Sequence, residues 1–437
     1  MIALLMVLAL QQQAGATVIR AGTLIDGTGA APVKNAVIVV QGDRITAVGG
    51  GANVAIPTGA TVIDLSSETV LPGFIDAHVH LAGRTIGDGD WQHSRLTEMS
   101  SQLALLGAAH AQQTLEAGFT TVRVVGSAAF GDVALRNAIN AGWIPGPHIV
   151  AAGISFGIRG GHCDETNGLQ PEALGHEGGV EVGVADGLDE VRNAVRYAVK
   201  YGADVIKICA TGGVLTLTDS AGVQQYSEEE MRAIVEAATQ LDRRVAAHAH
   251  GTAGIKAAVR AGVTSIEHGS ILDAEAVTLM KQHGTWLVPT LLAGFTVESL
   301  ATAGRLPAPI AAKALAIAPR MHTSFKLALD GGVKIALGTD AGVMKHGTNA
   351  REFELMVRYG MTPMQAIVAG TASGATLLGV ERDAGTIAVG RRADIVAAQG
   401  DPLQNITVLQ HVDFVMKDGK VFKRGGQVVG WSDAAVP

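Results

Sequence analysis

The chain has 437 residues and a formal net charge of −7, with 48% hydrophobic and 17% charged residues. This composition excludes an intrinsically disordered chain, and because no basic stripe is present we expect no nucleic-acid partner. Glycine occurs 56 times, whereas there are only four Trp, four Tyr and nine Phe. The core is therefore expected to consist of small aliphatic residues, with many tight turns.

An apolar run over residues 2–10 opens the chain, and the A-x-A pattern Ala14-Gly15-Ala16 follows it. This order is typical of a signal peptide, here residues 1–16, and predicts a periplasmic or secreted protein. The alternative is a frayed first strand in a cytoplasmic protein. The run is too short to cross a bilayer, and no other segment has about 18 uninterrupted apolar residues. We therefore expect no membrane span.

Short alternating strands with Gly-rich turns are expected in two separate parts of the chain. The first part is residues 17–72, with strands near 18–20, 36–41, 44–48 and 61–65. The second is residues 379–437, with strands near 386–389, 393–398, 412–417 and 420–423. The simplest assembly is one small split β-sandwich domain formed by both chain ends.

Between these parts, over residues 73–378, short apolar runs alternate with Ala-rich helical stretches. Eight candidate strands end at His80, Val125, Ala152, Ile208, His248, Glu267, Val288 and Leu337. Each is followed by a loop and a helix-like segment, and a Ser227…Glu230 capping box opens one of these helices. The pattern predicts an α/β fold, a (β/α)8 TIM barrel whose chemistry lies at the C-terminal ends of the strands.

Polar residues gather at these strand ends. His78 and His80 lie two residues apart on one strand and so point to the same face. Lys207 interrupts an apolar strand, and an isolated buried ammonium must be paired, neutral or modified. At the tips of three further strands, or just beyond them, lie His248, His268 and Asp340. Four imidazoles with oxygen ligands suit Zn²⁺, with Mn²⁺, Co²⁺ or Fe²⁺ as alternatives.

These residues, the segment Val70-Leu71-Pro72-Gly73-Phe74-Ile75-Asp76-Ala77-His78-Val79-His80 and the split β-domain resemble the amidohydrolase superfamily. Residues 117–123, 202–207 and 337–342 are similar to its binuclear prolidase-like and carboxypeptidase-like branch. That branch includes enzymes that hydrolyse Xaa-Pro dipeptides, other peptides and ochratoxin A. The resemblance implies an amidase for a small or dipeptide-like substrate that releases a C-terminal amino acid, and a homo-oligomer up to an octamer.

The resemblance also implies a role for each ligand. His78 and His80 would bind the more buried of two divalent ions, and His248 and His268 the more exposed one. The resemblance implies zinc for both ions. Lys207, carboxylated by CO2, would bridge both. Asp340 would ligate the first ion and shuttle a proton, while a hydroxide between the ions attacks the scissile carbonyl.

A second group of residues is expected to contact the substrate: His162, His250, Tyr226, Arg123 and His346. For His250 and Tyr226 a catalytic role is also considered. The alternatives are a packed or solvent-facing histidine at 250, an ordinary loop aromatic at 226 and local turn capping by His162.

Two positions depart from the family pattern: Val124 stands where relatives usually carry Asp, and Cys163 where Gly is more usual. Cys163 and Cys209 form no disulfide framework and are interpreted as structural residues. The alternative function is opening of a cyclic amide, as in imidazolonepropionases, or deamination. Lys207 and Gly251, which stands where deaminases place a glutamate, disfavour deamination. A binding protein with a dead site is a third class, but no expected ligand is missing.

Overall fold

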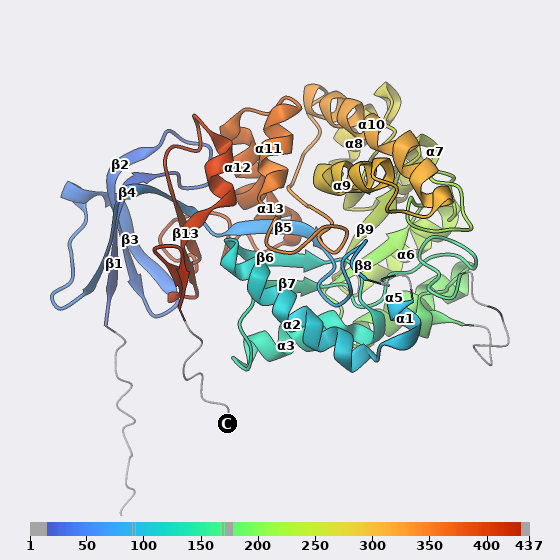
Figure 1. The fold of residues 1–437 in the computed structure, drawn as a ribbon, viewed down its shortest axis with the longest axis horizontal. Helices are drawn as coiled ribbons and strands as arrows, with labels where there is room; N and C mark the ends of the chain where they lie inside the picture. The colour runs from blue at the N-terminus through green and yellow to red at the C-terminus, as the bar shows by residue number, and fades with distance from the viewer. Residues whose placement is uncertain (1–14, 90, 92, 168–169, 171–177, 430–437) are drawn as a thin grey trace, which may run out of the picture.

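The computed structural model describes residues 15–89, 91, 93–167, 170 and 178–429 (Figure 1). The signal peptide predicted over residues 1–16 therefore lies almost entirely outside the described residues. The described chain forms a β-domain and a barrel. Figure 1 shows the β-domain, with β1–β4 and β13, beside the barrel and its helices.

Strands from both chain ends form one eight-stranded sheet in the order β15-β14-β13-β12-β4-β1-β2-β3. Their bounds are β1 (Thr17–Leu24), β2 (Val33–Gln41), β3 (Arg44–Gly50), β4 (Thr61–Pro72), β12 (Ile395–Gln399), β13 (Val412–Lys417), β14 (Lys420–Arg424) and β15 (Gln427–Val428). Strand β4 joins the two ends, because it pairs with β1 in parallel and with β12 antiparallel. Ile19 and Ile38 share one buried core with Ile395 and Phe414, so the sheet curls over its own apolar residues. The strand predicted at 386–389 is wrong, since these residues form a bend and a turn.

Seven parallel strands and one irregular segment form the barrel. The strands are β5 (Phe74–Val79), β6 (Phe119–Val124), β7 (His148–Ala151), β8 (Val205–Cys209), β9 (Arg244–Ala249), β10 (Ser265–His268) and β11 (Trp286–Val288). In the eighth position, residues 334–341 are linked to β5 and β11: the Ala77 amide donates to Leu337 O (2.9 Å) and the Leu287 amide to Lys334 O (2.8 Å). Between β7 and β8, the Phe156 amide donates to Lys207 O (2.9 Å). The predicted (β/α)8 barrel is confirmed.

Helices surround the strands (Figure 1). They are α1 (Ser94–Thr97), α2 (Ser100–Glu116), α3 (Gly131–Asn140), α5 (Leu188–Lys200), α6 (Glu228–Gln240), α7 (Thr252–Ala261), α8 (Ala274–His283), α9 (Leu291–Thr302), α10 (Ala308–Asp330), α11 (Arg351–Arg358), α12 (Pro363–Val368) and α13 (Gly374–Leu378). Short turns of 3-10 helix are η1 (Gly51–Asn53), η2 (Ala128–Phe130), η3 (Val180–Val182) and η5 (Ile406–Gln410), and η4 (Ala369–Ser373) is a π-helical turn. The capping box expected at the start of α6 is present, with Ser227 accepting a hydrogen bond from the Glu230 amide. Small aliphatic residues fill the buried helix faces, as α5 shows with Val191, Ala194 and Ala198.

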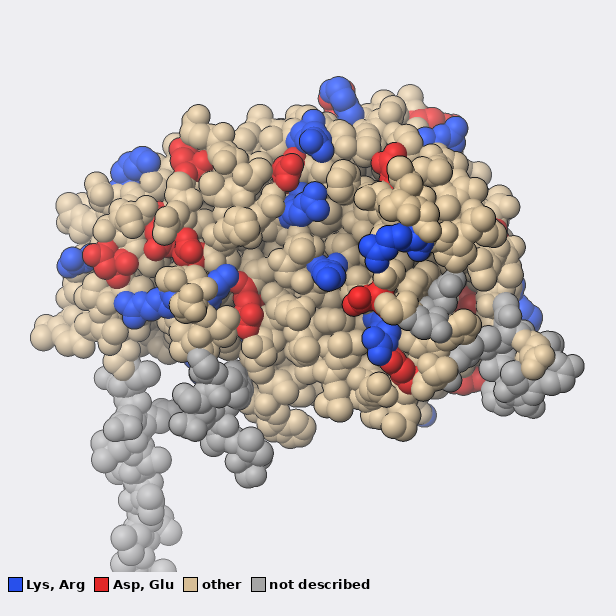
Figure 2. Space-filling view, viewed as in Figure 1, with Lys and Arg blue, Asp and Glu red and all other residues tan. Residues whose placement is uncertain are grey.

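Charged side chains of both signs are interspersed on the face shown in Figure 2. Within the described part of the chain, no helix has both the length and the apolar character needed to cross a membrane.

Candidate metal centre and active site

Six histidine rings lie against one another where the barrel strands end. The distances between ring centroids are 5.6 Å for His78–His80, 5.0 Å for His78–His268, 4.6 Å for His248–His268, 4.6 Å for His248–His250 and 4.3 Å for His162–His248. Four of these rings belong to the predicted metal ligands. The structure thus brings together side chains that are up to 190 positions apart in the sequence, because the strand ends of a parallel barrel meet on one face.

Asp340 faces the first two histidines. Its Oδ1 lies 3.4 Å from Nε2 of His78 and 3.4 Å from Nε2 of His80. The other ring nitrogens are occupied: Nδ1 of His80 donates to the Gly126 carbonyl (3.0 Å) and Nδ1 of His78 donates to Oε2 of Glu267 (2.7 Å). A carbonyl oxygen can only accept, so the partner assigns the proton of His80 to Nδ1. Both Nε2 lone pairs are then directed at the site and available as ligands.

The donor set fits a divalent cation. Ligand atoms of His78, His268 and Asp340 all lie within 4.8 Å of one another, and the three residues are buried. Nε2 of His248 is also buried and has no hydrogen-bond partner among the described atoms. A buried imidazole nitrogen without a partner is costly, and a metal ion would satisfy it. Two imidazoles with a carboxylate and a further imidazole suit zinc or a similar borderline ion.

Burial keeps these imidazoles neutral. It lowers the pKa of His80 to about 4, although the Asp340 carboxylate opposes this, and it lowers the pKa values of His248 and His268 well below the ordinary value. The neutral imidazole is the form that binds metals. The site is therefore prepared to bind a cation at neutral pH without releasing protons from these rings.

Lys207 lies on β8 and is only 4% exposed. Burial lowers the pKa of its amine to about 8, against the opposing charges of Glu267 and Asp340. Among the described residues its ammonium has no ion-pair partner within contact distance. The expected buried lysine is present, and it lacks the close partner that a buried ammonium needs.

Two predicted ligands have unusual backbone conformations. The φ angles of His268 and Asp340 are 70° and 63°, in the left-handed region that residues with a Cβ seldom adopt. Such conformations persist only where the surrounding structure enforces them, and they gather at functional sites. Beyond Asp340, Gly342 has φ 117° and would place a Cβ 3.0 Å from the backbone oxygen of His80, so a glycine is required there.

Glu267 is a functional residue to which sequence reasoning assigned no role. Its side chain is fully buried, and it accepts hydrogen bonds from His78, from Nη2 of Arg123 (2.8 Å) and from Oγ of Ser265 (2.5 Å). Burial raises its pKa, but the charge of Arg123 and the hydrogen bond from His78 outweigh this and lower the pKa to about 2. The signal in the sequence was a charged residue inside the apolar strand that ends at His268.

Two expected substrate contacts lie elsewhere. Arg123 is 2% exposed, and its guanidinium donates to Glu267, to Ser265 and to the Ala77 carbonyl, so it supports the first ligand strand and cannot reach a substrate. Tyr226 is fully buried in the barrel core, where its hydroxyl donates to the Ala185 carbonyl (2.8 Å). The expected substrate contacts of Arg123 and Tyr226 are therefore wrong for one reason: each polar group is buried in the core and already has hydrogen-bond partners there.

The remaining histidines are near the centre but differ in position. His250 is buried, with Nδ1 2.6 Å from Oγ of Ser270, and burial lowers its pKa to about 3. His162 is half-buried and stacks on His248. His346 stacks instead on His110 of α2, with ring centroids 4.3 Å apart, and is 5% exposed. Of the three, His162 and His250 lie against the candidate metal ligand His248, and His346 packs against His110.

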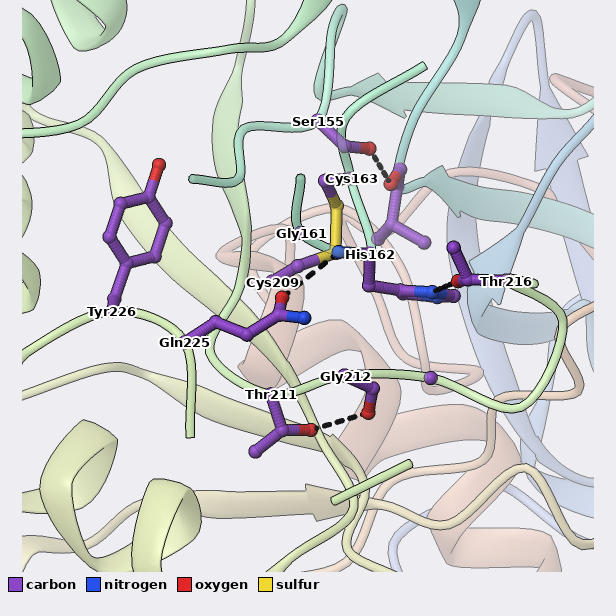
Figure 3. The surroundings of a disulfide bond; sticks show 12 residues. Ser155, Gly161, His162, Cys163, Cys209, Thr211, Gly212, Thr216, Gln225 and Tyr226 are labelled. Atoms are coloured by element: carbon purple, nitrogen blue, oxygen red, sulfur yellow. Dashed lines mark hydrogen bonds between the residues drawn. A yellow bond between two sulfur atoms is a disulfide. The ribbon is translucent and has the colours of Figure 1, made fainter. Parts of the chain in front are cut away.

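The two cysteines, interpreted as separate structural residues, are joined in a disulfide. Their Cα atoms are 5.7 Å apart and 46 positions separate them in the sequence. The bond connects the loop after β7 to the last residue of β8 (Figure 3). Neither a CxxC spacing nor any other local pattern signalled this pairing.

Comparison with known proteins agrees with this geometry. A family model described as "Amidohydrolase family" matches residues 69–422. Ochratoxinase from Aspergillus niger is 35% identical over 453 aligned positions, covering 98% of this chain and 91% of that protein. The crystal structure of a Xaa-Pro dipeptidase with bound methionine has a TM-score of 0.88 at 41% identity and covers 94% of this chain and 100% of that one.

A prolidase complexed with N-methylphosphonate-L-proline has a TM-score of 0.85 at 32% identity, covering 94% of this chain and 100% of that one. The resemblance inferred from the strand-end residues is thereby confirmed. The chain belongs to the amidohydrolase family and is an enzyme that hydrolyses amide bonds.

Proposed function

We propose that this enzyme cleaves the amide bond to a C-terminal amino acid, in a dipeptide such as Xaa-Pro, an N-acyl amino acid or an aryl amide such as ochratoxin A. The observation that carries the proposal is the convergence of His78, His80, His248, His268 and Asp340 around one buried point next to Lys207. The similar proteins named above support the substrate class, since their names specify Xaa-Pro dipeptides, a proline phosphonate and ochratoxin.

In this proposal two divalent ions, most simply Zn²⁺, bind at the centre. His78, His80 and Asp340 would hold one, and His248 and His268 the other. Such ions act as Lewis acids on a carbonyl oxygen and lower the pKa of water. The neutral imidazoles and the partnerless Nε2 of His248 support this assignment.

Lys207 would link the two ions after reaction with CO2. The neutral amine forms a C–N bond to CO2 and releases one proton, which leaves a carbamate anion. Its buried position favours this change, because burial lowers the pKa of the amine to about 8 and an anionic carbamate is better matched to a cationic centre than a bare ammonium.

Asp340 is the residue placed to move the proton. Although burial raises the pKa of its carboxyl, the groups of His78, His80 and Lys207 that face it outweigh burial and lower the pKa below the usual range. The carboxylate is therefore ionised at neutral pH and can accept a proton from the attacking water. It would then donate that proton to the leaving amine, whose departure otherwise requires an unstable amide anion.

His162 and His250 are the side chains placed to contact the substrate. Both rings lie against His248, at 4.3 and 4.6 Å between centroids. They could donate hydrogen bonds to a substrate oxygen or to the free carboxylate of the leaving amino acid. Arg123 has no part in this step, because its donors are used in the core.

Hydrolysis assays test the proposal. The enzyme, loaded with zinc and bicarbonate, is incubated with Xaa-Pro and Xaa-Phe dipeptides, N-acyl amino acids, ochratoxin A and a set of cyclic amides. Release of a C-terminal amino acid from one of the first four classes is expected. Turnover of the cyclic amides alone would reject the proposal in favour of ring opening. Metal counting by plasma mass spectrometry should give about two ions per chain.

We also propose that the protein is exported and forms a homo-oligomer. The A-x-A pattern supports export, and so does the disulfide, since such bonds persist in oxidising compartments. N-terminal sequencing of protein from the cell envelope or medium should begin near Thr17, whereas an intact N-terminus in cytoplasmic protein would overturn the export proposal. Sedimentation analysis should give a mass several times 44.8 kDa.

A further inference from the structure

We propose that the Cys163–Cys209 disulfide positions His162 at the metal centre, so that the affinity of the enzyme for its substrate depends on the oxidation state of this bond. The inference rests on the proposed function for its effect on substrate. Its effect on the protein can be measured without any turnover.

The disulfide connects the loop that carries His162 to β8, the strand that carries Lys207. Cys163 directly follows His162, and Cys209 is the last residue of β8, two positions after Lys207. Cys209 is itself fixed, since its amide donates to the Phe156 carbonyl (2.8 Å) and it pairs in register with His248 of β9. Figure 3 shows the sulfur bridge beside the His162 ring. The loop is thereby attached covalently to β8, which carries Lys207 and pairs with the strand that carries His248.

His162 itself is held in a specific orientation. Its ring stacks on that of His248 with an interplanar angle of 30°. Its amide donates to Oε1 of Gln225 (2.9 Å), and its Nδ1 is hydrogen-bonded to Oγ1 of Thr216 (Figure 3). On another side, a Cβ at Gly213 would lie 2.1 Å from the ring. The ring therefore occupies a fitted space whose walls come from the segment 211–225.

That segment keeps its own shape without the disulfide. Nζ of Lys313 on α10 donates to Gly213 O (2.8 Å) and to Oδ1 of Asp219 (3.1 Å). Oδ2 of Asp219 in turn accepts from the Gly213 amide (3.0 Å) and from Nε2 of Gln225 (3.1 Å). Hydrogen bonds that do not involve the disulfide thus hold the segment that forms one side of the His162 space.

On the other side of His162, two of the described hydrogen bonds lie within its own loop. Asp164 accepts from the amides of Gly160 (2.8 Å) and Thr166 (2.9 Å), which are contacts within the loop. Such bonds preserve the local turn but do not join it to β8. Earlier in the loop, Phe156 already joins β8 through backbone hydrogen bonds with Lys207 (2.9 Å) and Cys209 (2.8 Å). The disulfide adds a covalent link to β8 directly beside His162, so opening it should let residues 157–164 and the His162 ring leave the fitted space while the metal ligands stay in place.

A water-soluble trialkylphosphine reduces the disulfide in two steps. Phosphorus attacks one sulfur and the S–S bond breaks, which releases the other sulfur as a thiolate. Water then hydrolyses the phosphorus–sulfur bond, so that the products are two thiols and one phosphine oxide. Cys163 is half-buried and Cys209 is 2% exposed, so we expect the phosphine to attack at Cys163.

The test compares oxidised and phosphine-reduced enzyme, both loaded with zinc. Hydrogen–deuterium exchange should increase in peptides covering residues 157–164 on reduction, and not in β9 or β10. Affinity for N-methylphosphonate-L-proline and 1/KM should fall about tenfold or more, with kcat changed less than about twofold and metal content unchanged. Equal exchange and equal KM in the two forms would overturn the proposal, as would alkylation of both cysteines in the untreated enzyme.

Two variants serve as controls. The double variant Cys163→Ala/Cys209→Ala should match the reduced enzyme and show no response to phosphine, because the chain has no other cysteine. In His162→Ala, KM should already be raised and reduction should add little, since the two changes remove the same contact. A further tenfold rise on reducing His162→Ala would contradict the assignment to His162. If no amide is cleaved at all, the hydrogen–deuterium exchange result still decides this inference separately, because it needs neither substrate nor inhibitor.

Discussion

Nδ1 of His78 donates a hydrogen bond of 2.7 Å to Oε2 of Glu267, and both side chains are at most 1% exposed. The bond fixes the orientation of the imidazole and directs its Nε2 at the metal centre. It also connects the first predicted ligand to Arg123, through the second oxygen of the same carboxylate.

Glu267→Gln should weaken zinc binding by about 10–100-fold, because an orienting partner of a metal-binding imidazole is lost. The uncharged amide also leaves Arg123 without its counter-ion, so the free energy of unfolding should fall by about 3–5 kcal/mol. Zinc titration and urea unfolding measure the two effects. Ser265→Ala, which removes one hydrogen bond to the same carboxylate, is the matched control and should keep zinc affinity near that of the wild type.

Lys207→Ala should lower the metal content from about two ions per chain to about one or fewer and abolish turnover, since no carbamate can form. Added short-chain carboxylates such as acetate should restore part of the activity by occupying the space of the missing side chain. Plasma mass spectrometry and kcat, each with and without acetate, give the answer. Full activity of Lys207→Ala without acetate would reject the bridging role.

Asp340→Asn should reduce kcat by about 10²–10⁴-fold, the usual contribution of a positioned proton carrier. Asparagine is the suitable replacement because it tolerates the left-handed backbone at this position better than alanine does. Thermal unfolding should change little. Asp383→Asn, which only breaks the ion pair with Arg44 in the β-domain, is expected to leave kcat unchanged. A similar loss in both variants would point to a general effect on the fold.

A cluster at the boundary between barrel and β-domain should make stability depend on pH. Oδ1 of Asp418 lies 3.1 Å from Nε2 of His148, at the start of β7. Burial raises the pKa of Asp418, but the contact with His148 and the charge of Lys417 outweigh burial, so the pKa falls below its ordinary value of 3.8. A lowered carboxyl pKa stabilises the fold above the ordinary value, and this stabilisation is lost as the pH falls further.

Asp418→Asn should therefore destabilise the protein by about 1–3 kcal/mol at pH 7. Below pH 3.8 its difference from the wild type should shrink by about 1.4 kcal/mol per pH unit. Urea unfolding at several pH values measures this trend. Asp401→Asn, an exposed turn position in the same domain, is the control and should show no such slope. A difference that stays constant down to pH 3 would disprove the role of the ion pair.

The sequence alone predicted the barrel and the polar residues at its strand ends. These predictions depend on alternation along a strand and on the position of strand ends, which are local properties. His78, His80 and Asp340 show them directly. The assignments of Arg123 and Tyr226 failed because the same local patterns describe a side chain facing the substrate and one buried against a core carbonyl. Only the packing of distant elements distinguishes them.

The contact of Glu267 with His78 and the Cys163–Cys209 disulfide were not predicted, for the same reason. Glu267 was visible as a charge in an apolar strand, but its partner His78 lies 189 positions away. The cysteines were visible as well, yet their pairing depends on the approach of β8 to the loop after β7. In each case the contact joins two segments that are far apart in the sequence, and neither segment predicts the contact on its own.

The connection between the two domains has a mechanical consequence. Strand β4 ends at Pro72 and β5 begins at Phe74, so Gly73 alone separates the sheet of the β-domain from the strand that presents His78. A Cβ at Gly73 would lie 2.1 Å from Thr120, which leaves no room for a larger residue. A change in the tilt of the β-domain sheet is therefore expected to shift β5 and, with it, His78.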